Sequence, residues 1–209
     1  KGDLYIVSIG VSNYLNTKYN LKYAAKDATD VMETLTGKSV DLYSTIKQKL
    51  LTNESVNSVV LKDVSAFLSG AKENDVVIIF VAGHGLLDAN FDYFFATYDV
   101  DFNNPAGKGI SYEMLESLLG SIKAYQKLLI MDTCHSGELD KEEVEEVKNE
   151  DVNLGDVQFR AVGISAAEKE GFGVANSNEL MEELFTDVRK GTGATVISSA
   201  GGVEFAMES

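Results

Sequence analysis

Two stretches of this sequence follow the same pattern: Asp75-Val-Val-Ile-Ile-Phe-Val-Ala-Gly-His84-Gly85 and Lys127-Leu-Leu-Ile-Met-Asp132-Thr-Cys134-His-Ser-Gly137. In each, a run of apolar residues leads into a short polar segment that contains glycine. Such runs, bounded by turn signals, are typical of strands buried on both faces of a parallel sheet. Helical segments alternate with strands along the rest of the chain, which predicts βαβ units and an α/β fold.

Apolar spacing predicts the other elements. Besides the two strands above, we expect strands over 4–11, 40–43 and 194–200. A helix is expected over 23–35, and a second is expected to begin at Asn53 or Ser55 and to include the apolar residues of 59–68. A third helix is expected over 111–122, with Ser111 as its N-cap. Residues 91–100 are aromatic and predict a hairpin-like excursion or a bent strand, and 179–190 has helical spacing.

Composition limits the class of protein. The chain has 209 residues, 44% of them hydrophobic, which suffices for one compact core, so we expect a single domain. The net charge of −15 argues against nucleic acid and is compatible with a basic substrate. No apolar stretch approaches the ~20 residues of a membrane span. One cysteine cannot form an internal disulfide, which favours a reducing, cytoplasmic compartment.

His84 and Cys134 are the residues that could perform chemistry. Ligands bind outside the carboxyl ends of parallel strands, so on neighbouring strands the thiol and the imidazole would face each other there. The imidazole could then activate the thiol as a nucleophile and later protonate the leaving amine. His135 is a poorer base, because adjacent residues usually point in different directions. The backbone N–H groups of Gly85 and Cys134 could form an oxyanion hole, in which one donor is typically worth ~2.7–4 kcal/mol.

Each of these two residues, taken alone, has an ordinary structural interpretation. A single cysteine after a strand is more often an inert small hydrophobic residue than a nucleophile. A single histidine between glycines is more often a turn residue. The matched contexts of His84 and Cys134, and the spacing of about 50 residues between them, favour the catalytic interpretation.

The sequence resembles the caspase-like cysteine peptidases, a superfamily that includes caspases, metacaspases and bacterial relatives. The resemblance rests on Val81-Ala-Gly-His84-Gly85 and Asp132-Thr-Cys134-His-Ser-Gly137. Tyr5-Ile-Val-Ser-Ile-Gly-Val11 and Leu21-Lys-Tyr-Ala-Ala-Lys-Asp27-Ala28 support it. It implies a three-layer α/β/α sandwich around a mostly parallel sheet, with His84 and Cys134 as a catalytic dyad. The cysteine motif is closer to metacaspases and bacterial caspase-like proteins than to animal caspases.

The resemblance also implies a specificity pocket. In metacaspases an aspartate that matches Asp132 lines this pocket, together with a second that aligns with Asp27. Two carboxylates stabilise a cationic side chain and repel an anionic one, so we expect cleavage after Arg or Lys. The competing structural roles are a solvated helix residue for Asp27 and a backbone hydrogen bond for Asp132. The chain's aspartates match no EF-hand-type loop, so neither a metal site nor a cofactor is predicted.

The domain is expected to divide as caspase-like domains do. Residues 1–137 resemble a large subunit, about 138–193 an acidic linker, and 194–209 the start of a small subunit that looks incomplete. Basic residues in the linker make self-cleavage an expectation. The expected partners are a protein or peptide substrate with a basic residue before the cut, and a regulatory or fused sensor domain, without nucleic acid or membrane. The alternative is a catalytically silent caspase-like binding or scaffold module.

Overall fold

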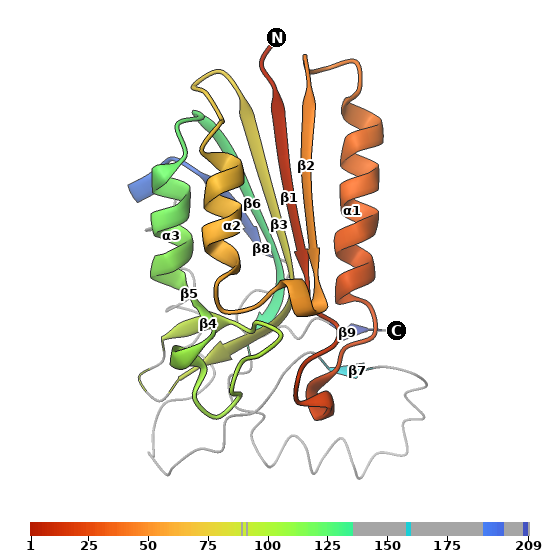
Figure 1. Ribbon diagram of the computed structural model, residues 1–209, viewed down its shortest axis with the longest axis vertical. Helices are drawn as coiled ribbons and strands as arrows, with labels where there is room; N and C mark the ends of the chain where they lie inside the picture. The colour runs from red at the N-terminus through yellow and green to blue at the C-terminus, as the bar shows by residue number, and fades with distance from the viewer. Residues whose placement is uncertain (89, 91, 136–157, 160–189, 199–206, 209) are drawn as a thin grey trace.

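The computed structural model describes residues 1–88, 90, 92–135, 158–159, 190–198 and 207–208, with the backbone alone at 134–135, 158–159 and 207–208. Its main sheet has seven strands (Figure 1). Five of them are parallel in the order β2-β1-β3-β6-β8, with bounds Ile46–Thr52, Leu4–Gly10, Val76–Leu87, Gln126–His135 and Thr195–Ser198. The strands β4 (Tyr93–Phe95) and β5 (Ile110–Ser111) add an antiparallel extension. A separate antiparallel pair joins β7 (Gln158–Phe159) to β9 (Met207–Glu208).

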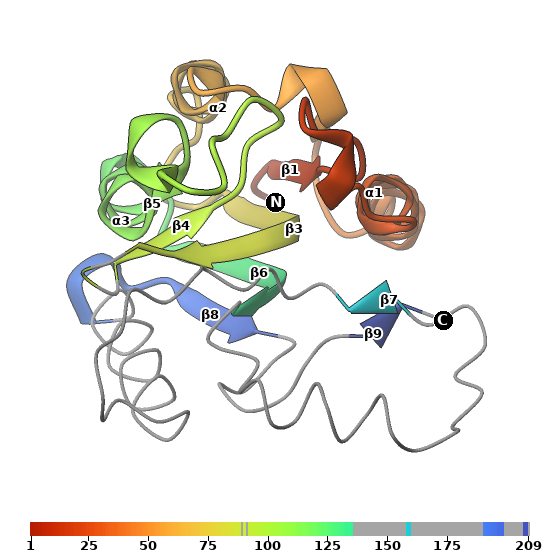
Figure 2. The ribbon, with the colours of Figure 1, turned by 90° about the horizontal axis from the view of Figure 1, so that it is seen from below.

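Helices cover both faces of the sheet. The helix α1 (Ala24–Ser39) lies on one side, and α2 (Val60–Leu68) and α3 (Tyr112–Ser121) lie on the other (Figure 2). The expected α/β sandwich around a mostly parallel sheet is therefore confirmed. In the part of the chain that the structure describes, no helix is both long enough and apolar enough to cross a membrane.

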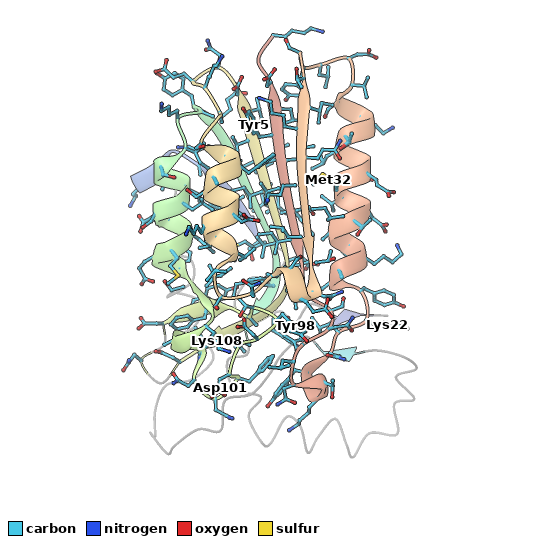
Figure 3. All side chains as sticks on the ribbon, viewed as in Figure 1. Tyr5, Lys22, Met32, Tyr98, Asp101 and Lys108 are labelled. Carbon is cyan, nitrogen blue, oxygen red and sulfur yellow. The ribbon has the colours of Figure 1, made fainter. Side chains whose placement is uncertain are left out.

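The interior strand β1 shows why the sheet is buried on both faces. The ring of Tyr5 meets that of Phe67 on α2 at 5.7 Å, whereas Leu4 and Ile6 pack with Met32 on α1 (Figure 3). Alternate residues of a strand point to opposite faces, so the apolar run from Leu4 to Val7 contributes to both layers. Each large apolar side chain buried in this way contributes about 1.5–3 kcal/mol.

The strand expected over 40–43 is wrong. The helix α1 continues to Ser39, residues 40–44 form the turn that follows, and the second strand of the sequence is β2. The reason is that β2 lies at an edge of the sheet, where the partly buried Lys47 and Lys49 alternate with the exposed Gln48 and Leu50, and no long apolar run is needed.

The predicted start of the second helix is also wrong. Asn53 to Ser55 form a short 3-10 turn, and α2 begins only at Val60. Instead of capping a helix, the side-chain oxygen of Asn53 accepts hydrogen bonds from the backbone N–H groups of Ser12 and Asn13. The third helix begins as predicted, since the Ser111 hydroxyl accepts from the N–H of Met114.

His84 lies inside a strand that continues to Leu87, beyond the short polar segment where the sequence predicted that the strand would end. Once β1 ends at Gly10, opposite Ala82, β3 continues to Leu87 and takes β4 as its new antiparallel neighbour. This β3–β4 pair confirms the hairpin-like excursion expected within 91–100. The replacement of one neighbour by another extends β3 beyond the glycine where a strand was expected to stop.

Several expectations concern residues outside the described ranges. Most of the acidic linker at 138–193 and of the helix at 179–190 falls there. The strand expected over 194–200 is present as β8, which pairs with β6.

Candidate active site

The sheet brings the two predicted catalytic residues to the same level. In the parallel ladder of β3 and β6, His84 is the register partner of Cys134. The flanking pairs are Gly83 with Thr133 and Gly85 with His135. Residues 50 positions apart in the sequence are therefore neighbours at the carboxyl end of the sheet, as the strand pattern predicted.

The backbone carbonyl of Tyr19 fixes the protonation pattern of the His84 ring. The Nε2 atom lies 2.9 Å from this carbonyl oxygen, and the side chain is only 2% exposed. Because a carbonyl only accepts, Nε2 must donate this bond. In the neutral ring the lone pair then belongs to Nδ1, which is the nitrogen that can act as a base.

Two aromatic rings contact the imidazole of His84, and a third packs against one of them. Its ring centroid lies 5.3 Å from that of Tyr14 and 5.7 Å from that of Phe102. Phe102 stacks on Tyr19 at 3.8 Å and meets Tyr14 edge-on at 5.2 Å. Such pairs contribute about 0.5–1.5 kcal/mol each beyond their buried area, so the ring of His84 has little freedom to turn.

The Tyr14 hydroxyl also supports the backbone at this point. It accepts a hydrogen bond of 3.1 Å from the N–H of His84. Gly83 has φ +153°, and a Cβ there would lie 3.0 Å from both the Tyr14 hydroxyl and the Phe95 ring. Glycine is therefore required next to His84 by conformation and by space.

Hydrogen bonds hold residues 12–20, which follow β1, at several positions. The Asn53 side chain binds the loop as described above, and the N–H of Leu15 donates to the Tyr98 carbonyl. The side-chain oxygen of Asn20 accepts from the N–H of Tyr14. These bonds place the Tyr19 carbonyl against His84.

Asp27 and Asp132 lie on the same face of the sheet. Gly10, Ala82 and Asp132 are register partners across β1, β3 and β6, and paired residues of neighbouring strands share a face. A Cβ on Gly10 would lie 2.4 Å from the Ala24 carbonyl oxygen, so this is the face that the first turn of α1 covers. That turn carries Asp27, and both carboxylates are partly buried.

The start of α1 is anchored to the strand beside it. Ser12, just after β1, accepts a hydrogen bond from the N–H of Ala25 through its hydroxyl oxygen at 2.8 Å. The Ser8 hydroxyl donates to the Ala28 carbonyl at 2.6 Å. With the close contact at Gly10, these bonds fix the position of Asp27 relative to the sheet.

Comparison with known proteins identifies the family. The family model of the caspase domain, Peptidase_C14, matches residues 5–201. The chain belongs to the caspase domain family. Among solved structures, a Geobacter sulfurreducens protein from a structural genomics programme is similar, with a TM-score of 0.61 and 16% sequence identity. The match covers 97% of this chain and 75% of that one, and it shows the shared fold. No curated protein sequence matches the chain significantly.

In this caspase domain, Gly85 is paired with residues of both strands that flank the end of β3. It pairs with Phe95 on β4 and with His135 on β6. The structure thus places Gly85 one residue beyond the His84–Cys134 level. Its predicted role in an oxyanion hole, shared with the N–H of Cys134, stays a prediction.

The residues that surround the His84–Cys134 pair could not be predicted from the sequence. Tyr14, Tyr19 and Phe102 surround His84, and the buried hydroxyls of Tyr93 and Thr133 form a 2.8 Å hydrogen bond immediately before Cys134. Their contacts join loops that are distant in the sequence. Aromatic residues between predicted strands were the only available signal, and they do not reveal which residue they contact.

Within the described residues, no three His, Cys, Asp or Glu side chains gather closely enough to hold a metal ion.

Proposed function

We propose that this caspase domain is a cysteine endopeptidase in which Cys134 is the nucleophile and His84 the general acid and base. The observation that carries the proposal is the shared register of His84 and Cys134, together with the Nε2–Tyr19 bond that leaves Nδ1 as the basic nitrogen. Membership of the family supports the same reaction.

The chemistry divides into two steps. Nδ1 of His84 takes the thiol proton, the sulfur of Cys134 bonds to the scissile carbonyl carbon, and a tetrahedral oxyanion forms. The C–N bond then breaks as the imidazolium gives its proton to the leaving amine, which leaves a thioester. In the second step His84 takes a proton from water, and the hydroxide adds to the thioester carbon. The C–S bond then breaks as the imidazolium returns its proton to the sulfur, which restores the thiol.

The backbone would stabilise the oxyanion. We propose the N–H groups of Gly85 and Cys134 as the donors, each worth about 2.7–4 kcal/mol in a preorganised site. The carbonyl of Tyr19 has a separate role. It orients the imidazole and stabilises the imidazolium that forms in each step.

Asp27 and Asp132 are proposed to select Arg or Lys before the scissile bond. Their common face and partial burial support this role, since two carboxylates around one site attract a cation and disfavour an acidic side chain. Loss of one charge-assisted hydrogen bond costs about 1.5–3 kcal/mol, or roughly 10- to 150-fold in kcat/KM.

A fluorogenic peptide panel tests the reaction and the specificity together. The panel varies only the residue before the scissile bond, as Arg, Lys, Asp or Leu, and is applied to the wild type, Asp27→Asn and Asp132→Asn. We expect turnover of the Arg and Lys peptides, reduced in both variants. Cleavage after Asp or Leu would keep the dyad and reject the pocket. If no peptide of the panel were hydrolysed, the result would favour a catalytically silent binding or scaffold module.

We also propose self-cleavage within 138–193, where Lys141, Lys148, Arg160, Lys169, Arg189 and Lys190 offer basic sites. Intact-protein mass spectrometry would reject this idea if the segment stayed whole in the wild type as it does in Cys134→Ala. The single cysteine supports a cytoplasmic location. A fused sensor or regulatory domain is the proposed partner besides the basic substrate.

A further inference from the structure

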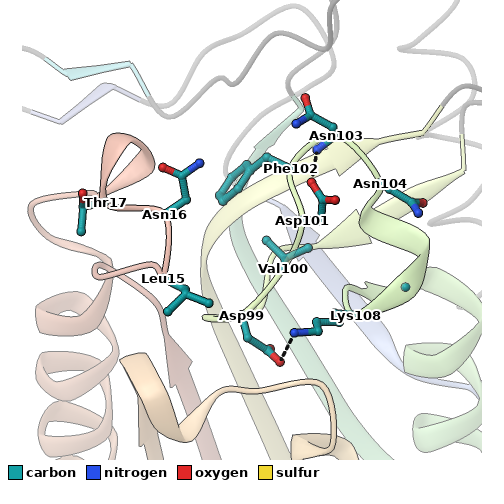
Figure 4. Close-up of a pocket in the computed structure, with 11 residues that line it drawn as sticks. Leu15, Asn16, Thr17, Asp99, Val100, Asp101, Phe102, Asn103, Asn104 and Lys108 are labelled. Carbon is teal, nitrogen blue, oxygen red and sulfur yellow. Dashed lines mark hydrogen bonds and ion pairs between the residues drawn. The ribbon is translucent and has the colours of Figure 1, made fainter.

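A pocket of about 820 Å³ opens beside the proposed active site (Figure 4). It lies between the loop that follows β1 and the segment that follows β4. Its walls combine apolar, amide and charged side chains, among them Asp99, Val100, Asp101, Phe102, Asn103 and Lys108. Its volume is within the usual range of ligand pockets, about 300–1,000 Å³.

The pocket shares a wall with the environment of His84. Phe102 lines it, and the same ring stacks on Tyr19 and points edge-on to the imidazole. Phe102 is only 6% exposed, so it forms a firm boundary between the two. A group held in the pocket would therefore lie next to the residue that protonates the leaving amine.

Sheet topology puts the pocket and the nucleophile on opposite sides of His84. The strand β6, which carries Cys134, pairs with one edge of β3. The strands β1 and β4, whose following segments build the pocket, pair with the other edge. When a substrate presents its scissile carbonyl to Cys134 and its leaving amine to His84, the residues after the scissile bond extend toward this pocket.

The two carboxylates in the pocket differ in their partners. Asp99 accepts hydrogen bonds from Ser58 and Thr97 and pairs with the Lys108 ammonium at 3.3 Å. Burial opposes the charge of Asp99, but the Thr97 hydroxyl and the Lys108 cation outweigh burial and lower its pKa. Asp99 is thus a neutralised, structural carboxylate.

Asp101 carries the negative charge that a ligand could meet. It is exposed, and its carboxylate accepts one hydrogen bond, from the N–H of Asn103. Over the described part of the chain, it makes no ion pair with a lysine or arginine. Beneath it, Val100 and Phe102 are buried apolar residues. An apolar floor under a carboxylate suits a side chain with a hydrocarbon stem and a cationic end.

We propose that this pocket is a subsite for a Lys or Arg within the first two residues after the scissile bond, recognised by Asp101. The assignment rests on the proposed peptidase function for its orientation, with the acyl part at Cys134 and the leaving part beyond His84. Together with the Asp27–Asp132 pocket, it makes the preferred substrate basic on both sides of the cut.

The first test measures binding and needs no turnover. The Cys134→Ala protein is titrated, by NMR, with acetyl-Lys-Gly-Gly-amide and with the same peptide carrying norleucine or Glu in place of Lys. Norleucine keeps the stem and removes the charge. We expect the Lys peptide to bind about fivefold tighter than the norleucine peptide, as one exposed ion pair allows, and the Glu peptide to bind weakest.

Matched variants decide whether Asp101 is responsible. Asp101→Asn keeps the oxygen that accepts from Asn103 and removes the charge. Asp41→Asn removes one charge near the start of β2, at the opposite end of the strands. The preference for Lys should disappear in Asp101→Asn and persist in Asp41→Asn. Equal affinities in the parent protein, a preference that survives in Asp101→Asn, or no saturable binding of any peptide would overturn the proposal.

A second test separates the subsite from the reaction. Internally quenched peptides with Arg before the bond and Lys, norleucine or Glu after it are given to the wild-type chain. A Lys preference in kcat/KM that depends on Asp101 supports both ideas. Turnover that ignores the residue after the bond rejects the subsite and keeps the peptidase. Asp101-dependent binding without any turnover supports the binding pocket and rejects the peptidase.

Discussion

The buried hydrogen bond between Tyr93 and Thr133 should couple the hairpin after His84 to the strand end that carries Cys134. The hydroxyls lie 2.8 Å apart, and both side chains are 1% exposed. Tyr93→Phe removes one hydroxyl and keeps the ring. Thr133→Val removes the other and keeps the shape of the side chain, so each variant deletes one end of the same bond.

The burial of both hydroxyls determines the expected size of the effect. Removing one partner leaves the other oxygen without this bond in a site closed to water, which costs about 1–3 kcal/mol. For a chain of this length, 1 kcal/mol corresponds to a shift in Tm of about 2–4 °C. The double variant removes both ends, so it should cost clearly less than the sum of the single variants. We expect a coupling free energy of about 1 kcal/mol between Tyr93 and Thr133.

Urea unfolding of the wild type, Tyr93→Phe, Thr133→Val and the double variant measures this coupling. Peptide turnover by the same four proteins reports whether the bond also positions Cys134. Both single variants should lower kcat more than they raise KM, because the bond orients the nucleophile and is not expected to contact substrate. Additive losses of stability in the double variant would show that the two hydroxyls do not act together and would refute the reasoning.

Three further variants test the backbone conformation of β3 and α1 and the carboxylate at the start of β3. Gly83→Ala forces a Cβ to within 3.0 Å of Phe95 and Tyr14 at φ +153°, so it should lower the unfolding free energy by about 1–3 kcal/mol in urea. Gly37→Ala, in α1 with nothing within 4 Å of the added Cβ, should instead raise the unfolding free energy by about 0.5–1 kcal/mol. A change of the same sign in both glycine variants would contradict the argument. Asp75 accepts two backbone N–H groups, which lower its pKa despite burial. Its stabilising effect should be complete above its unfolded pKa of about 3.9 and lost as pH falls through the lower folded value. Asp75→Asn should therefore flatten the acid side of a stability-against-pH curve, and an unchanged acid side would disprove the role.

The sequence predicted the parts of the fold that depend on local pattern. The two apolar runs specified β3 and β6 as buried parallel strands, and their carboxyl ends correctly indicated that His84 and Cys134 would be neighbours. The Ser111 cap was also predictable, because its partner Met114 lies only three residues away. In both cases the physical cause is contained in one short stretch of sequence.

The sequence could not predict contacts that join distant loops. The strand was expected to end at His84, because nothing in 75–85 shows that β4 will pair with β3 after β1 ends. The carbonyl of Tyr19 is a backbone group, so no residue type marks it as the partner of His84. The expected strand at 40–43 failed for a related reason, since an edge strand such as β2 needs few apolar residues.

The most direct test of the peptidase proposal is steady-state hydrolysis of an Arg-containing fluorogenic peptide by the wild type, Cys134→Ala and His84→Ala. The account predicts turnover by the wild type alone, with both variants folded, as judged by their urea unfolding curves. Turnover that survives in Cys134→Ala would contradict the assignment of the nucleophile. Full activity in His84→Ala would contradict the role of the imidazole that Tyr19 orients.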